Sequence, residues 1–192
     1  MDNLIPQKPI VLASGSPRRQ ALLEQLGLSF QVKKSDVDES YSANWAIEEI
    51  PVQLAARKAQ YFNAFTENYV IVGADTIVTF KDQVLGKPKN EAEAHAYLSM
   101  LSGQTHRVIS GCSIISAGQS SDFIDITEVK FKELGRQAIE HYIKHYQPFD
   151  KAGAYAIQEW IGLIGVEWIK GSYVNVVGLP VHKVYEELLK LG

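Results

Sequence analysis

The amino-acid sequence predicts an α/β fold built on a mixed β-sheet. Segments rich in β-branched residues alternate along the chain with segments of helical periodicity, as in proteins whose strands are joined through helices. Two long β-rich runs, residues 106–116 and 123–131, are separated only by the turn-like residues 117–120, so at least one pair of strands forms an antiparallel hairpin. The length of 192 residues fits one domain, or one domain of two lobes, with a sizeable core.

The N-terminal part of the chain predicts a strand, a tight loop and a helix. Residues 10–13 form a short apolar run of the kind found in buried strands. Ser16 is a favourable N-cap, Pro17 suits the first helical position, and Gly27 is a typical helix stop. We then expect a second strand, a polar acidic loop and an alanine-rich helix, at residues 30–33, 35–45 and 51–65 respectively.

The rest of the chain continues the alternation. Residues 70–80 are strongly β-like but interrupted at residues 73–75, and a turn follows at 81–83. Asn90 caps the next helix, with Glu93 placed as in a capping box, and Gly103 ends that helix. After the hairpin we expect a helix, a glycine-punctuated apolar segment and a short amphipathic closing helix, the first two at residues 137–146 and 151–180.

Composition and charge exclude several classes of partner. The formal net charge is −3 and no block of like charges occurs, which argues against binding to nucleic acid through a basic face. The single cysteine, Cys112, cannot form an internal disulfide, and its apolar neighbours predict an inert, packed thiol in a reducing compartment. The sequence shows neither the apolar stretch of a signal peptide nor a run long enough to span a membrane. We therefore expect a cytoplasmic protein without a membrane partner.

The first candidate site is the segment Ser14-Gly15-Ser16-Pro17-Arg18-Arg19. A glycine-containing turn that leads into a helix presents backbone N–H groups and the positive end of the helix dipole, which suits a phosphate group. The serine hydroxyls add donors, and Arg18 can bind phosphate oxygens through two N–H groups. An ordinary capped helix with solvated arginines would give the same pattern. Neither the P-loop spacing nor a nucleophile elbow occurs in the sequence.

The second candidate site is Asp75, which we expect at the end of the strand that begins at Val70. Carboxylates at strand ends are where α/β folds place ligand chemistry, and Asp75 could bind a metal or deprotonate a water molecule. An acid from the loop that contains Asp38 and Glu39 would complete a Mg²⁺ site, because Mg²⁺ takes one or two carboxylates plus waters and phosphates. A turn aspartate and a solvated acidic loop are the alternatives.

Seven segments in order resemble the Maf family of nucleotide pyrophosphatases, a family linked to inhibition of septum formation. They are LASGSPRR (12–19), ARKAQ (56–60), VGADTIV (72–78), LGKP (85–88), LSGQTHRVISG (101–111), DKAGAYAIQ (150–158) and GSYVNVVGLP (171–180). The resemblance implies a two-lobed, mixed-sheet α/β fold like that of inosine triphosphate pyrophosphatase, formed by residues 1–192 around a central nucleotide cleft. Members of the family are often homodimers.

The resemblance also implies a role for each candidate residue. Asp75 is the proton acceptor that activates the attacking water, and Asp38 and Glu39 join it around a divalent cation, Mg²⁺ or Mn²⁺. The residues that hold the triphosphate and neutralise its charge are Ser14, Ser16, Arg19, Lys58 and Lys87. Splitting the bond between the α- and β-phosphates needs in-line attack by water and stabilisation of negative charge, which this set supplies.

The family divides by substrate, and at three residues this chain resembles the dTTP/UTP branch. Arg18, Thr76 and Gln158 match that branch, whereas the 7-methyl-GTP branch has Ser-Asp-Gln around the catalytic acid. A glutamine amide can pair with the O4 and N3–H edge of uracil or thymine. Many relatives have glycine after this glutamine, whereas this chain has Glu159. An NTP-binding regulator of cell division and a purine-specific pyrophosphatase are the competing hypotheses.

Overall fold

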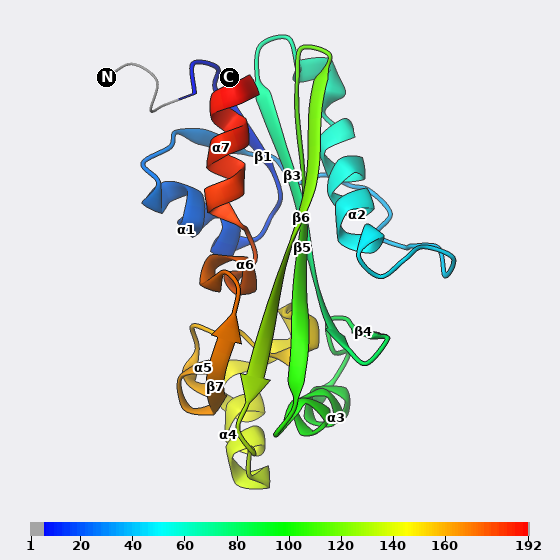
Figure 1. The fold of residues 1–192 in the computed structure, drawn as a ribbon, viewed down its shortest axis with the longest axis vertical. Helices are drawn as coiled ribbons and strands as arrows, with labels where there is room; N and C mark the ends of the chain where they lie inside the picture. Colours follow the sequence, from blue (N-terminus) through cyan, green and yellow to red (C-terminus); the bar gives the residue numbers. More distant parts are fainter. Residues whose placement is uncertain (1–5, 192) are drawn as a thin grey trace. The chain divides into compact units, whose positions relative to one another are not determined.

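The computed structural model describes residues 6–191, which fold into a seven-stranded mixed sheet with helices (Figure 1). The elements in chain order are β1 (Ile10–Ala13), α1 (Pro17–Gln25), β2 (Phe30–Val32), α2 (Glu49–Gln60), η1 (Asn63–Phe65), β3 (Val70–Phe80), β4 (Gln83–Leu85), α3 (Glu91–Leu101), β5 (Thr105–Ser116), β6 (Gln119–Phe131), α4 (Arg136–Tyr146), η2 (Pro148–Asp150), η3 (Ala152–Ala154), α5 (Trp160–Gly165), β7 (Val166–Lys170), α6 (Tyr173–Val177) and α7 (Val181–Leu191). The α/β class predicted from the sequence is confirmed.

The sheet has the strand order β2-β1-β3-β5-β6-β7, with β4 paired to β3. Strand β1 runs parallel to both β2 and β3. Strand β4 is antiparallel to β3, and β7 is antiparallel to β6. The chain forms two compact units, which we call unit 1 and unit 2. Unit 1 contains the chain through Asp75, Ser110–Asp125 and the chain from Gly178, and unit 2 contains Thr76–Ile109 and Ile126–Val177.

In unit 1, helix α2 covers one face of the strands, and helices α1 and α7 lie on the other (Figure 1). Two glycines allow α2 to approach the sheet closely. A Cβ atom on Gly73 of β3 would lie 2.2 Å from the carbonyl oxygen of Ala55, and one on Gly111 of β5 would lie 2.2 Å from the backbone of Pro51. Both contacts involve backbone atoms of α2, so no side-chain rotation could relieve them.

In unit 2, helices α3, α4 and α5 enclose an apolar core. Leu98 of α3, Tyr142 of α4 and Ile161 of α5 are fully buried in this core together with Phe131 of β6. The side chain of Asn90 accepts a hydrogen bond from the N–H of Glu93, 2.9 Å away, so the predicted N-cap of α3 is confirmed. No helix in the described part of the chain is long and apolar enough to cross a membrane.

Two predicted boundaries were wrong. Residues 73–75 do not interrupt the strand, because β3 continues from Val70 to Phe80 and Gly73 pairs with Ala13 of β1. The glycine in this strand serves close helix packing and does not break the extended backbone. Helix α2 begins before Pro51 and ends at Gln60, where a short 3₁₀ turn, η1, replaces its expected last turn. The glycine-punctuated segment 151–180, for which the sequence predicted no helix or strand, contains η3, α5, β7 and α6.

Candidate active site

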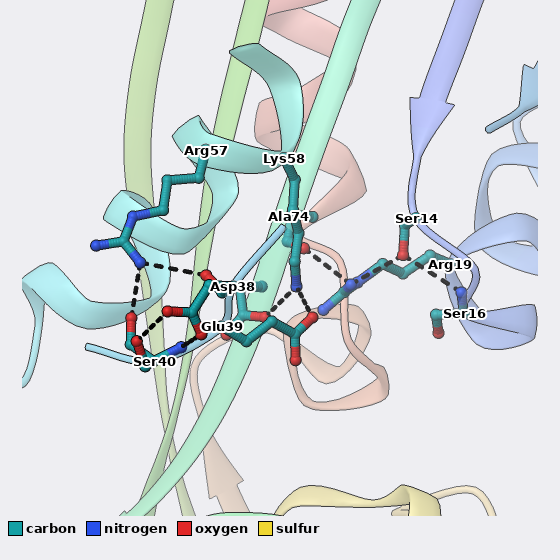
Figure 2. A network of polar contacts seen from close by, with 10 residues as sticks. Ser14, Ser16, Arg19, Asp38, Glu39, Ser40, Arg57, Lys58 and Ala74 are labelled. Atoms are coloured by element: carbon teal, nitrogen blue, oxygen red, sulfur yellow. Dashed lines mark hydrogen bonds and ion pairs between the residues drawn. The ribbon is translucent and has the colours of Figure 1, made fainter. Parts of the chain in front are cut away.

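A buried lysine joins two carboxylates in unit 1 (Figure 2). Lys58 extends from α2, is 7% exposed, and places its Nζ 2.7 Å from Oδ1 of Asp75 and 2.8 Å from Oε1 of Glu39. Asp75 lies within β3 and is half-buried, whereas Glu39 comes from the acidic loop before α2 and is largely exposed. The close approach of α2 to Gly73 brings the lysine within reach of the strand acid. Asp75 therefore lies in the middle of a strand, and its carboxylate is held by a cation.

Arg19 connects the loop after β1 with β3 and with the segment before α7. Its Nε donates to the carbonyl oxygen of Gly178 at 2.9 Å, and its Nη1 donates to Ser14 Oγ at 3.0 Å and to the carbonyl oxygen of Ala74 at 2.9 Å. Burial lowers the pKa of Arg19 below its usual value, and the charge of Asp75 opposes that shift. Because the contacts of Arg19 include the residue before Asp75, the arginine fixes the backbone from which the acid projects.

The other residues of the first candidate segment lie next to Arg19. Ser14 is buried, and its Oγ also accepts a hydrogen bond from the N–H of Ser16 at 3.3 Å. Ser16 occupies the N-cap position of α1, as predicted, but its side chain makes no capping hydrogen bond. The half-buried hydroxyl of Ser16 therefore does not cap the helix. Arg18 is half-buried in the first helical turn.

The acidic loop is held against α2 by Arg57, a residue that the sequence analysis did not single out. Its Nη1 donates to the carbonyl oxygens of Asp38 at 3.2 Å and Ser40 at 2.7 Å, and its guanidinium carbon lies 5.0 Å from the centre of the Trp45 ring. The carboxylate of Asp38 accepts hydrogen bonds from the hydroxyl and the N–H of Ser40, which lower its pKa. Arg57 precedes Lys58 in the ARKAQ segment, and this adjacency is its only signal in the sequence.

Two of the three predicted metal ligands are close together. The carboxylates of Asp75 and Glu39 both contact the ammonium group of Lys58. Two carboxylates, with waters and phosphates, suit Mg²⁺ or Mn²⁺. The carboxylate of Asp38 is instead bonded to Ser40, so its part in the metal site stays a prediction. Among residues 6–191, no group of three or more His, Cys, Asp or Glu side chains is arranged to hold an ion. The pair therefore fits a cation that takes its remaining ligands from water and substrate.

The predicted residues of unit 2 are on β3 and on two loops. Thr76 follows Asp75 in β3 and is half-buried, while Lys87 and Gln158 are exposed. The two loops are joined, because the N–H of Gly153 donates to the carbonyl oxygen of Gly86 at 3.1 Å. Gly153 has a φ of +67°, and a Cβ atom there would lie 2.8 Å from Val78, so both its conformation and its contact require glycine.

Buried polar groups support the loop that carries Gln158. His106 of β5 is 2% exposed, and its Nε2 lies 2.7 Å from the hydroxyl of Tyr155. Burial lowers the pKa of His106 to about 3, so this histidine is neutral at physiological pH and serves as a structural hydrogen-bonding group.

Comparison with known proteins agrees with the family resemblance of the seven sequence segments. The profile of the Maf-like protein family matches residues 9–191. The chain is 48% identical to a protein of Phocaeicola vulgatus named dTTP/UTP pyrophosphatase, with both chains fully covered. Proteins of the same name from Parabacteroides distasonis and Christiangramia forsetii are 47% and 44% identical, with at least 98% of each chain covered.

Proposed function

Because the chain belongs to the Maf-like protein family, we propose that it is a nucleoside triphosphate pyrophosphatase acting on dTTP and UTP. The products are the nucleoside monophosphate and pyrophosphate. The observation that carries this proposal is the carboxylate of Asp75, held by the buried Lys58 beside Glu39 in a chain whose full-length relatives bear that name. The arrangement supplies a base for water and carboxylates for a cation within one small cluster.

The reaction adds water across the bond between the α- and β-phosphates. We assign Asp75 as the group that accepts a proton from the attacking water, while the water oxygen bonds to the α-phosphorus. The bond from that phosphorus to the bridging oxygen breaks, and pyrophosphate leaves with the bridging oxygen. Lys58 contacts Oδ1 of Asp75 and fixes the orientation of the carboxylate. The proposed partners of the triphosphate are Ser14, Ser16, Arg19, Lys58 and Lys87.

The cluster of Arg19, Lys58, Asp75 and Glu39 has no net positive charge, which supports the proposal that a divalent cation takes part. The charges of Arg19 and Lys58 balance those of Asp75 and Glu39, so these four side chains offer a polyanionic substrate little net attraction. Mg²⁺ or Mn²⁺ held by Asp75 and Glu39, with Asp38 as a further candidate ligand, would supply positive charge and polarise phosphate oxygens. The residues of the chain would then hold and orient the substrate.

We assign recognition of the base to Gln158, with Thr76 and Arg18 as the other residues that mark the pyrimidine branch. Gln158 is exposed, and its amide carries both an acceptor and donors, as the uracil and thymine edge requires.

Three further expectations stay predictions of the sequence. They are the homodimer, the single two-lobed domain and the cytoplasmic location.

The proposal is tested by measuring pyrophosphate release from dTTP, UTP, CTP, ATP, GTP and 7-methyl-GTP with Mg²⁺ or Mn²⁺. We expect turnover of dTTP and UTP by the wild type, and its collapse in Asp75→Asn. Asp82→Asn, which changes an exposed aspartate in the turn after β3, is the matched control and should retain activity. Binding of dTTP without release of pyrophosphate would instead indicate a nucleotide-sensing regulator. A preference for 7-methyl-GTP would indicate the purine branch.

A further inference from the structure

The segment between Lys151 and Glu159 of unit 2 is closed by an ion pair between its two ends. Nζ of Lys151 lies 3.3 Å from Oε1 of Glu159, and both side chains are largely removed from solvent, with exposures of 9% and 24%. Lys151 also contacts the exposed Asp150, 2.7 Å away. Gln158, the residue assigned to the base, directly precedes Glu159. The ion pair therefore fixes the chain on the C-terminal side of the base-reading residue.

A buried tyrosine holds the same glutamate from α4. The hydroxyl of Tyr142 donates to Oε2 of Glu159 and accepts a hydrogen bond from the N–H of Ala156 at 3.2 Å. Tyr142 is fully buried, and burial together with the bond to Glu159 raises its pKa, so the phenol stays protonated and remains a donor. Tyr142 thus binds the backbone two residues before Gln158 and the side chain one residue after it.

Glu159 uses both carboxylate oxygens within the protein. Oε1 faces Lys151 and Oε2 accepts from Tyr142, so the carboxylate is directed into unit 2. Its backbone carbonyl also begins α5 by accepting from the N–H groups of Gly162 at 2.9 Å and Leu163 at 3.1 Å. A residue with these contacts acts through the placement of its neighbours.

We propose that Glu159, held by Tyr142 and Lys151, is a positioning residue that orders the Gln158 loop for recognition of the pyrimidine base. This inference rests on the proposed function, because it assigns specificity to that reaction. An exposed glutamine on an unrestrained turn would lose conformational entropy on binding, and a loop ordered beforehand reduces that cost. The base is remote from the phosphorus that reacts, so the ordering acts on binding and base preference more than on the chemical step.

The test compares steady-state kinetics of Glu159→Ala and Glu159→Gln with UTP, dTTP and ATP. For Glu159→Ala we expect KM for UTP and dTTP to rise about tenfold with kcat within about twofold, the scale set by losing a hydrogen-bonded contact. Preference over ATP should fall by a similar factor. Glutamine retains an acceptor for the hydroxyl of Tyr142, so Glu159→Gln should recover most of the wild-type KM. Tyr142→Phe, which removes the donor, should reproduce the effect of Glu159→Ala.

Glu140→Ala is the matched control. Glu140 is on the same helix as Tyr142, is half exposed, and forms an ion pair with the exposed Arg136 at 2.6 Å. Its kinetics should match the wild type. Partial unfolding of a variant would lower the apparent kcat for every substrate equally, whereas the proposal requires a change in KM and in base preference.

The outcomes separate the two proposals. Absence of dTTP and UTP turnover in the wild type would overturn the proposed function and this inference with it. Normal wild-type turnover with unchanged KM and base preference in Glu159→Ala would overturn the inference alone. A loss of kcat at constant KM in a Glu159→Ala protein that unfolds at the same Tm as the wild type would also overturn it, because the glutamate would then act on the chemical step.

Discussion

Replacing Gly73 with alanine tests whether the close approach of α2 to β3 assembles the active site. The added Cβ atom would lie 2.2 Å from the carbonyl oxygen of Ala55, 2.9 Å from the amide nitrogen of Ala59 and 3.0 Å from its Cβ. Lys58 is next to Ala59 in α2, and Asp75 lies two residues after Gly73 in β3. The clash therefore occurs between the two elements that present the 2.7 Å ion pair.

The size of the effect follows from these distances. Restoring ordinary contact distances from the 2.2 Å approach requires α2 to move by about 1.3–1.8 Å, because non-bonded heavy atoms are most stable about 3.5–4.0 Å apart. Overpacking of this kind costs about 1–3 kcal/mol, which corresponds to a fall of roughly 3–10 °C in Tm for a chain of this size. A displacement of about 1 Å at a catalytic group can lower turnover by about 100-fold. We therefore expect a loss of about 10–100-fold in kcat for UTP in a protein that still folds.

The assay combines thermal unfolding with pyrophosphate release from UTP. Gly135→Ala is the matched control, because a Cβ atom on Gly135 would meet no other atom within 4 Å. The control should stay close to the wild type in Tm and kcat. Wild-type Tm and turnover in Gly73→Ala would refute the reasoning, since α2 could then lie farther from β3 without consequence.

Three further predictions concern buried polar groups. Lys58→Met should lower kcat for UTP by roughly 100-fold, because it leaves Asp75 and Glu39 without their shared cation, and kinetics matching the wild type would contradict this. The pKa of His106 is about 3 in the folded state and about 6.5 when unfolded, so its contribution to stability is complete above about pH 6.5 and is lost as pH falls. Urea unfolding should show about 2–3 kcal/mol less stability at pH 4.5 than at pH 6.5, and parallel pH curves for wild type and His106→Gln would disprove this. Burial raises the pKa of Cys112 to about 12, so a disulfide reagent should modify it only on unfolding, whereas rapid labelling of native protein would show an accessible thiolate.

Short-range chemistry explains which parts of the fold the sequence predicts. Strand β1, helix α1 and the capped start of α3 were expected within a few residues, because hydrophobic runs, Pro17 and Asn90 act within one turn of chain. The interruption expected at residues 73–75 was wrong for the opposite reason. Gly73 is explained by the backbone of α2 above it, and a contact between distant segments leaves no local pattern.

In the site too, the sequence identifies individual residues but not the contacts between distant segments. The motifs identify Asp75 and Lys58 as chemically important residues, but their spacing does not indicate that these two side chains would contact each other. Tyr142 was part of an ordinary helical pattern, and its role depends on a glutamate 17 positions later in the chain. Glu159 was noted only as a departure from relatives with glycine, and its partners are visible only in the folded chain.

The two buried cations of unit 1 differ in what they can contribute to substrate binding. Arg19 donates three N–H groups to Gly178, Ser14 and Ala74, so two backbone carbonyls and a serine hydroxyl fix the position of its planar guanidinium. Lys58 carries a compact ammonium on a flexible stem, and one of its partners, Glu39, is largely exposed. Exchange of that outer contact for a phosphate oxygen would leave the pair with Asp75 intact. We therefore propose that Arg19 binds phosphate from a fixed position while it holds the backbone beside Asp75, whereas Lys58 is able to shift toward an incoming triphosphate.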